Sequence, residues 1–438
     1  MLAIPFGLAF AVALPPSAAP DEGYHLGRVW TLCEGHLRLP GPGDPPLSIP
    51  RSIPELFRAV NGERIPSEPP RRSLAELGAL LSQPLAPARR VNLNLGGAYP
   101  PLTYAATLIG VGIGRALGLP AAALFYLGRA TNLGAWIALS WLAIRLCPLR
   151  RWTLALLALA PMSIAMAASV SADPVTSAAA LLFLALVMRT AVGRSGPLAR
   201  AELVALLGSA LLLGTAKAGY WALAAAPLLI PAERCGGRGR LAALAAAVAF
   251  AVLAPSAWWL AEVRASGALA SGSGVDPAAH IGRMLADPIG FAGMLAATVA
   301  KFAGPWLRGF IGVLGQLTVR LPAFAYWAYA AALAVAMAAD GPQPALLTIG
   351  RRLLLLAIFL GCALAIIGLL YVGSNAPDAA QVNGVQGRYF IPGAPALLLA
   401  LPSLPRPLPR AAQLAIFSVA AAVGSSAVAA VLARFYAF

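Results

Sequence analysis

Asp21 and Glu22 stand side by side where the first apolar run ends, in the motif PDEGYH at residues 20–25. In a chain otherwise poor in charge, a carboxylate at the point where a membrane helix meets water can bind a cation or remove a proton from an acceptor. If the residues that follow are helical, Asp21, His25 and Arg28 lie on one face. An acid, an imidazole and a guanidinium there predict an anion-and-metal site. The alternative is an aspartate that only caps the helix.

A second carboxylate, Asp173, stands between two apolar runs in the motif SADP at residues 171–174. A carboxylate so close to hydrocarbon is costly unless it is paired or functional. A helix cap followed by Pro174 at the first helical position explains it as well. Lys217, one of two lysines, ends another apolar run, and a phosphate or a carboxylate such as Asp173 is its expected partner. The alternative for Lys217 is a snorkelling side chain.

Near the C-terminus, Arg388 and Tyr389 lie in the motif GVQGRYFIP at residues 384–392. Arg388 is the only basic residue of segment 374–390, and its planar guanidinium suits bidentate phosphate binding, with Tyr389 as an aromatic wall. Nearby glycines favour close approach of a ligand or of backbone. The alternative is an interfacial anchor made by the two side chains.

The composition indicates a polytopic membrane protein. Of the 438 residues, 60% are hydrophobic and 11% are charged, which leaves too little polar surface for a soluble domain. The net charge of +16 comes from arginines scattered in short turns, without a basic stripe, which argues against nucleic-acid binding. The four cysteines have no CxxC or Cys/His spacing, so neither a zinc site nor a disulfide framework is predicted.

Apolar runs long enough to cross a membrane predict an all-α fold with about eleven transmembrane helices. The runs lie at 1–17, 122–145, 152–171, 174–192, 201–216, 241–262, 322–339, 351–373 and 411–433, with shorter ones at 218–231 and 391–404. If the chain starts inside, the arginine-rich turns all fall on the inner side, as the positive-inside rule expects. These turns carry Arg145, Arg150, Arg151, Arg189, Arg194, Arg200, Arg234, Arg238, Arg240, Arg351, Arg352, Arg406 and Arg410.

Successive spans keep all the arginine-rich turns on the inner side only if residues 98–119 do not cross the membrane. We expect a juxtamembrane or re-entrant helix there, on the outer face, whose glycines serve close helix packing. The same alternation places 264–321 outside, with its apolar stretches 289–303 and 305–319 as surface helices or as a hairpin dipping into the membrane. The chain is thus predicted to be one transmembrane domain, 1–438, with a large first outer loop at 18–120 and a second outer segment at 264–321.

With these residues in hand, the chain resembles a bacterial membrane family, the domain of unknown function 2142, over nearly its whole length. That family is more distantly similar to the GT-C glycosyltransferases, which include protein mannosyltransferases and the aminoarabinose transferase of lipid A. The resemblance therefore implies a GT-C-like fold with juxtamembrane helices on the outer face. The motifs that carry it are PDEGYH (20–25), YPPLTY (99–104), GRATN (128–132), SAD (171–173), GVLG (312–315) and GRY (387–389).

The resemblance also implies residue roles. In GT-C enzymes an acidic motif directly after the first span supplies the base or a metal contact, and a second acidic residue lies in the next outer turn. Asp21 then carries over as base or metal contact, with Glu22 beside it, and Asp173 as the second catalytic carboxylate and metal ligand. The expected substrate-binding residues are His25, Arg28, Tyr99, Arg129, Lys217, Arg388 and Tyr389.

The leading hypothesis is an inverting transfer of a sugar from a polyprenyl-phosphate donor to a glycan or lipid acceptor. It would take place at the outer face of the bacterial inner membrane. The leaving phosphate gains charge, which Arg388, Lys217 and a divalent cation, Mg²⁺ or Mn²⁺, would stabilise. The runner-up is a transporter or flippase of lipid-linked glycans. It predicts charges deep inside several spans or inverted repeats, and the sequence displays neither. A non-catalytic scaffold would need none of these carboxylates.

Overall fold

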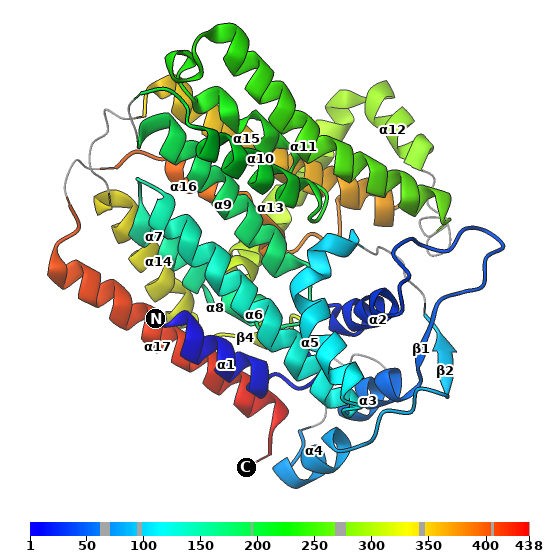
Figure 1. The fold of residues 1–438 in the computed structure, drawn as a ribbon. Coiled ribbons are helices and arrows are strands. Elements are labelled where there is room, and N and C mark those ends of the chain that lie inside the picture. Colours follow the sequence, from blue (N-terminus) through cyan, green and yellow to red (C-terminus); the bar gives the residue numbers. More distant parts are fainter. Residues whose placement is uncertain are drawn as a thin grey trace.

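The computed structural model describes residues 1–61, 71–93, 99–193, 196–267, 277–340, 347–403 and 407–437. In this part of the chain the fold is mostly helical, with two small two-stranded antiparallel sheets, β1–β2 and β3–β4 (Figure 1). The all-α membrane class that the sequence predicts is therefore confirmed.

Among the described residues, four helices are long and apolar enough to cross a membrane: α9 (Asp173–Val192), α11 (Arg238–Ala265), α15 (Ile349–Ser374) and α17 (Arg410–Phe435). The pair α12 (Pro277–Ala286) and α13 (Pro288–Gly312), bent by 106°, would make a fifth span if it counts as one. The protein is thus a multi-pass membrane protein.

Helix α9 is central, because other helices bury 78% of its apolar stretch. The corresponding shares for α11, α15 and α17 are 22%, 28% and 33%, and these three helices expose large apolar side chains such as Phe250, Leu364 and Phe417. Such surfaces suit contact with lipid. Along α9, Ala178 packs in an apolar cluster with α1 (Ala3–Ala13) and α17, while Phe183 packs in a second cluster with α10 (Arg200–Gly214) and α15.

The remaining predicted spans are also helical, but several are short. The longest are α6 (Ala121–Leu146) and α14 (Ala323–Ala339). The run 152–171 is divided into α7 (Arg151–Leu159) and α8 (Pro161–Ala167), because Pro161 lacks the N–H that would continue the first helix. The shorter runs form a 3₁₀ helix, η2 (Trp221–Leu229), and α16 (Ala394–Ala400). The count of eleven spans therefore stays a prediction.

The segment predicted not to cross forms a 3₁₀ turn, η1 (Pro101–Tyr104), and α5 (Ala105–Ala116). Twelve helical residues span about 18 Å, well short of the hydrocarbon thickness of about 30 Å. Helix α5 packs on α6 so closely that a Cβ at Gly110 would lie 2.2 Å from the Leu127 carbonyl oxygen. Gly110 and Gly114 thus serve helix packing, as the sequence predicts, whereas a Cβ at Gly112 or Gly118 would meet no neighbour within 4 Å.

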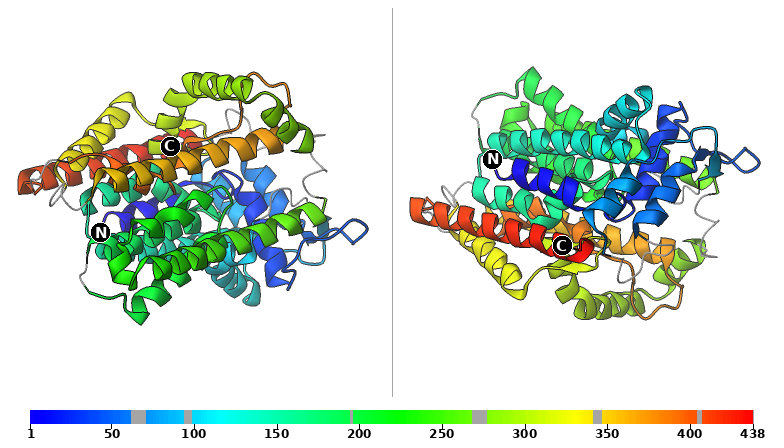
Figure 2. Two further views of the ribbon diagram at one scale, coloured as in Figure 1. Left: turned by 90° about the horizontal axis from the view of Figure 1, so that it is seen from above. Right: turned by 90° about the horizontal axis from the view of Figure 1, so that it is seen from below.

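The predicted first outer loop folds into α2 (Glu22–Cys33), α3 (Ser52–Asn61), α4 (Leu74–Leu81) and a two-stranded antiparallel sheet of β1 (Ser48–Pro50) with β2 (Arg90–Asn92). These elements gather with α5 at one side of the molecule, on the right in Figure 1, and the N-terminus and α7 lie on the other. In both views of Figure 2 the blue segment beyond α1 extends to the right-hand end of the molecule, and the N-terminus lies toward the left.

The second outer segment differs from the prediction. Helix α13 runs unbroken from Pro288 to Gly312, through Pro305, and then gives way to the hairpin of β3 (Val313–Leu314) with β4 (Val319–Arg320). The helix predicted over 305–319 is therefore wrong beyond Gly312. In Figure 2 the yellow-green helices α12 and α13 lie at the edge of the molecule, beside α15.

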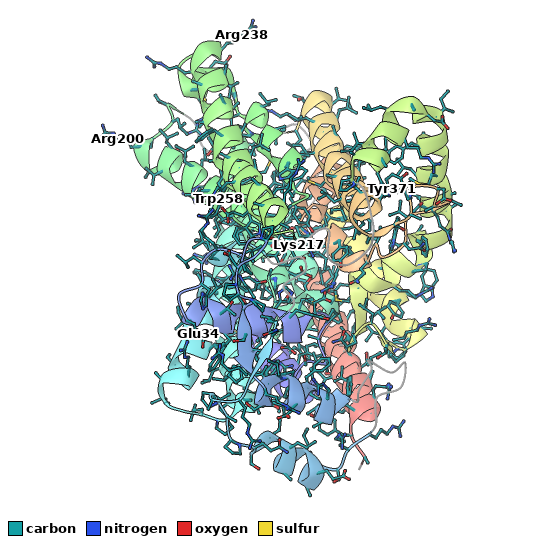
Figure 3. The ribbon with its side chains drawn as sticks, turned by 90° about the vertical axis from the view of Figure 1, so that its right-hand side faces the viewer. Glu34, Arg200, Lys217, Arg238, Trp258 and Tyr371 are labelled. Atoms are coloured by element: carbon teal, nitrogen blue, oxygen red, sulfur yellow. The ribbon has the colours of Figure 1, made fainter. Side chains whose placement is uncertain are left out.

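The arginines of the predicted inner turns stabilise helix ends. Arg150 and Arg352 both donate to the carbonyl of Leu401, beyond the end of α16, and Arg234 pairs with Glu202 at 3.2 Å. Figure 3 places Arg200 and Arg238 at one tip of the bundle, away from Lys217 near its middle. Two arginines of this prediction, Arg194 and Arg406, lie outside the described residues.

Candidate functional site

Four charged side chains from distant parts of the sequence meet near the start of α2 and of α9. Arg388 donates from Nη2 to Asp21 Oδ2 and from Nη1 to Asp173 Oδ2, both at 3.0 Å. Lys217 Nζ lies 3.2 Å from the other oxygen of Asp173. We call Asp21, Asp173, Lys217 and Arg388 the central cluster. It holds two negative and two positive charges, and it unites four residues that the sequence singled out separately.

Arg388 is the centre of this cluster, with 2% of its side chain exposed. It lies in a 3₁₀ turn, η5 (Gly387–Phe390), and its Nε donates to Gln386 Oε1 at 2.6 Å. A Cβ at Gly387 would lie 2.1 Å from the Trp306 carbonyl oxygen, so only glycine lets this turn pack against α13. Burial opposes the charge, but Asp173 and Asp21 outweigh it and raise the pKa of Arg388, which therefore stays charged.

Asp21 precedes α2 in a left-handed conformation, with φ of 61°, and its side chain makes no helix cap. The capping alternative for this carboxylate is therefore wrong, because the side chain turns to Arg388 instead. With 58% of that side chain exposed, Asp21 is the most accessible member of the central cluster. A non-glycine residue in this conformation is strained, and such strain often accompanies a functional constraint.

Asp173 and Lys217 form the inner half of the central cluster. Asp173 is the first residue of α9, and its carboxylate binds the two cations and caps no helix. Lys217 Nζ also lies 4.2 Å from the centre of the Tyr389 ring and 5.2 Å from that of Tyr99, as in a cation–π contact. Burial opposes its charge, but Asp173 and the tyrosines raise the pKa of Lys217 well above its ordinary value. Lys217 is thus paired and does not snorkel.

His25 borders the central cluster as a neutral side chain. Its Nδ1 lies 2.8 Å from the Tyr104 hydroxyl, and its ring stacks on Tyr99 at 5.7 Å between centroids. Burial lowers the pKa of His25 to about 4, although Asp173 and Asp21 favour the charged form. With Tyr99 and Tyr389, His25 therefore forms an aromatic wall beside the charges.

Glu22 and Arg129, both predicted site residues, form a separate buried pair. Neither side chain is exposed. The Glu22 carboxylate accepts hydrogen bonds from Arg129 Nε at 2.7 Å and from Arg129 Nη2 at 2.6 Å. The same carboxylate accepts the backbone N–H groups of Ser17 and Val170. Both carboxylate oxygens are thus engaged and inaccessible. Glu22 therefore fits a structural role and not the predicted role of a catalytic acid or base. Arg129 also donates to the carbonyls at the end of the first helix, those of Ala11, Leu14 and Pro15.

Arg28 does not join the central cluster. Its guanidinium donates to the carbonyls of His36 and Leu37, at 2.8 and 2.7 Å, beyond the C-terminal end of α2. Asp21 precedes α2 in a left-handed conformation, and Arg28 lies seven residues later, about 10 Å along the helix axis. The predicted arrangement of Asp21, His25 and Arg28 on one helix face therefore stays a prediction, and Arg28 lies away from the central cluster.

Two amides that the sequence reasoning did not assign hold the acidic loops. Gln316 donates from Nε2 to the carbonyls of Ser17 and Ala19, both at 2.8 Å, just before Asp21. Asn132 binds the carbonyls on either side of Val170 in the same way, those of Ser169 and Ser171. The sequence motifs could have pointed to these two residues. Asn132 is the last residue of GRATN, and Gln316 directly follows GVLG.

The donors around the two carboxylates fit a divalent cation poorly. Arg388 N–H groups bind both Asp21 and Asp173, so a Mg²⁺ or Mn²⁺ ion between them would meet the guanidinium. Within the described ranges, no group of three or more His, Cys, Asp or Glu side chains is placed to hold a metal ion. The fixed cations Lys217 and Arg388 already supply positive charge at this position.

The chain belongs to the family described as "Predicted membrane protein (DUF2142)", whose model matches residues 5–397. This match confirms the resemblance to the domain of unknown function 2142. All four residues of the central cluster lie inside the matched region. No curated protein and no solved structure matches the chain. The more distant likeness to GT-C glycosyltransferases stays a prediction.

Proposed function

We propose that this protein is a glycosyltransferase that moves a sugar from a polyprenyl-phosphate donor to a cell-envelope acceptor at the outer face of the membrane. One observation carries the proposal: Arg388 joins an accessible carboxylate, Asp21, to a shielded carboxylate, Asp173, that also holds Lys217. An accessible carboxylate is suited to act as a base, and fixed cations are suited to stabilise a leaving phosphate.

The proposed reaction inverts the anomeric carbon. The acceptor oxygen bonds to that carbon as its proton passes to Asp21, and the bond between the carbon and the phosphate oxygen breaks. The electron pair of the broken bond leaves with the polyprenyl phosphate, next to Arg388 and Lys217. Asp173 keeps these two cations in place and is a positioning residue. The proposal contains no metal-dependent step.

The test uses the full-length protein in liposomes with a panel of radiolabelled undecaprenyl-phosphate hexoses and envelope lipid extract as acceptor. We expect label in the acceptor fraction and an equal amount of undecaprenyl phosphate released. Asp21→Asn should abolish transfer without loss of folded protein, because the amide keeps the shape but takes up no proton. Asp44→Asn, at an exposed position of the same outer segment, is the matched control and should be fully active.

The competing function has its own readout in the same liposomes. A transporter would move the labelled lipid-linked sugar across the bilayer without releasing undecaprenyl phosphate. Translocation that persists in Asp21→Asn, with no transfer by the wild-type protein to any acceptor fraction, would replace the proposed transferase by a flippase.

A further inference from the structure

We infer that the acceptor is an amphiphile, whose apolar portion occupies a cavity beside Asp21. This inference rests on the proposed function and narrows its acceptor to a lipid. The cavity measures about 370 Å³, within the range of about 300–1,000 Å³ typical of small-molecule sites. It lies where α2, α3 and the β3–β4 hairpin come together. Its lining is Asp21, Glu22, Gly23, Tyr24, Ile49, Ile53, Pro54, Phe57, Leu93, Phe125 and Gln316.

The position of this cavity assigns it to the acceptor. Its lining includes Asp21 but none of Asp173, Lys217 and Arg388. A second cavity, of only about 20 Å³, has Asp173 and Arg388 in its lining but not Asp21. In an inverting displacement, the attacking oxygen and the leaving phosphate are on opposite faces of the reacting carbon. The large cavity therefore lies on the side of the proposed base, Asp21, where the acceptor attacks. The cations lie on the side from which the phosphate leaves.

The chemistry of the lining identifies the occupant as apolar. Aliphatic and aromatic side chains from α3, β1 and α6 make up most of the wall. The lining has four polar side chains, those of Asp21, Glu22, Tyr24 and Gln316. Glu22 is fully engaged by Arg129, the Gln316 amide nitrogen already donates to two carbonyls, and the Tyr24 hydroxyl carries no charge. Within the described lining, this leaves Asp21 as the side chain best placed to accept from a hydroxyl of the occupant.

A free glycan would fit this cavity badly. Each sugar hydroxyl placed against Ile53 or Phe57 would lose its water without gaining a partner, which disfavours binding. A lipid that carries one hydroxyl close to its apolar body would fit this cavity well. Its chain gains from burial, and its single hydroxyl reaches Asp21.

The test labels the cavity directly and does not depend on sugar transfer. The protein in nanodiscs is photo-crosslinked with a long-chain alcohol that carries a diazirine, and the labelled positions are mapped by mass spectrometry. We expect label on Ile49, Ile53 and Phe57. Ile53→Trp fills the cavity and should reduce this label several-fold. Arg58→Trp adds the same bulk on the exposed side of α3 and should leave it unchanged. Ile53→Phe provides a milder filling if the tryptophan variant is poorly folded.

Competition separates the acceptor from the donor as occupant. A lipid with a free hydroxyl should displace the probe, whereas undecaprenyl phosphate should not. In transfer assays, Ile53→Trp should raise KM for the lipid acceptor and leave KM for the sugar donor unchanged. Displacement by undecaprenyl phosphate alone would assign the cavity to the donor chain and overturn the inference, as would absence of label from all three residues. Label in the cavity of a protein without transferase activity would instead count against the proposed function.

Discussion

Glu22 and Arg129 form a bidentate ion pair without exposed side-chain surface, and this pair connects the two loops that carry the acidic residues of the central cluster. Through Ser17 it fixes the chain just before Asp21, and through Val170 it fixes the chain just before Asp173. The relative position of the two cluster carboxylates therefore depends on a charge pair that does not contact them.

Breaking this pair should destabilise the protein strongly. Glu22→Gln leaves the Arg129 charge buried without a counter-charge, which costs about 3–5 kcal/mol of the free energy of unfolding. Thermal or denaturant unfolding of the purified protein in detergent measures the loss. Glu55→Gln breaks the exposed Arg51–Glu55 pair, with 57% and 47% of the side chains exposed, and should cost no more than about 1 kcal/mol. Equal effects of the two substitutions would contradict the scaffold role of Glu22.

His25 should make the stability of the protein fall in acid. Its pKa is about 4 in the folded protein, because burial disfavours the charged imidazole, and its ordinary value is 6.5. Between these pH values His25 binds a proton in the unfolded chain and stays neutral in the folded protein. The free energy of unfolding therefore decreases as the pH falls from about 6.5 to about 4, and it is independent of His25 above that range.

His25→Gln should remove this part of the pH dependence, because the amide does not titrate. The measurement is the midpoint of thermal unfolding at a series of pH values in detergent. His36→Gln, at an exposed position just beyond α2, is the matched control and should keep the acid slope of the wild-type protein. The same slope in His25→Gln would assign the acid sensitivity to other groups.

The two ends of the bundle should lie on opposite sides of the membrane. In a protein without its native cysteines, a cysteine at position 238 should react with a membrane-impermeant maleimide only from the inside. A cysteine at position 37, where the Leu37 side chain is 60% exposed, should react only from the outside. Labelling of both positions from one side of sealed cells would overturn the predicted alternation of spans.

Sugar transfer should survive removal of divalent cations. The charge of the leaving phosphate is met by Arg388 and Lys217 in the proposed reaction, so incubation with EDTA should leave kcat/KM unchanged. The measurement is transfer before chelation, after it, and after Mg²⁺ or Mn²⁺ is added back. Loss of transfer that either cation restores would place a metal ion at Asp21 and Asp173, as the sequence first indicated.

The sequence singles out all four residues of the central cluster, because they lie next to apolar runs, but it also singles out Glu22, Arg28 and Arg129, which lie outside the cluster. The length of those runs and the arginine-rich turns place all four residues on one side of the membrane. For the same reason the sequence predicts a phosphate or a carboxylate such as Asp173 as the partner of Lys217, since a charge near hydrocarbon needs a partner. Long helices such as α9 and α15 begin and end within two residues of the predicted runs.

What the sequence does not predict depends on contacts between distant segments. Asp21 and Glu22 are chemically similar neighbours, and only the position of Arg129, 107 residues later, buries one of them and leaves the other accessible. Hydropathy patterns also fail to predict breaks and loops that depend on backbone geometry. Pro161 divides a run that hydropathy reads as one span, and three successive residues, Gly315 to Leu317, adopt positive φ in the loop that brings Gln316 to Ser17.

Arg388 provides the sharpest test of the central cluster, because its two Nη atoms bind two different carboxylates. Lysine keeps the charge but loses the planar fork, so Arg388→Lys should bind the donor phosphate poorly. Arg388→Ala should lose on the order of 2–4 kcal/mol of transition-state stabilisation, the range typical for removal of one oxyanion donor. The measurement is kcat/KM for the polyprenyl-phosphate sugar at matched amounts of folded protein.

Two further results separate phosphate binding by Arg388 from membrane anchoring. Soluble methylguanidine should restore part of the activity of Arg388→Ala, because it returns a guanidinium to the vacated position. Arg38→Lys, at a side chain that is 78% exposed and pairs with Glu262, is the matched control and should be fully active. An interfacial anchor would tolerate lysine at position 388 almost as well as arginine, and its activity would follow only the amount of protein. Wild-type kcat/KM in both Arg388→Lys and Arg388→Ala would remove Arg388 from the site.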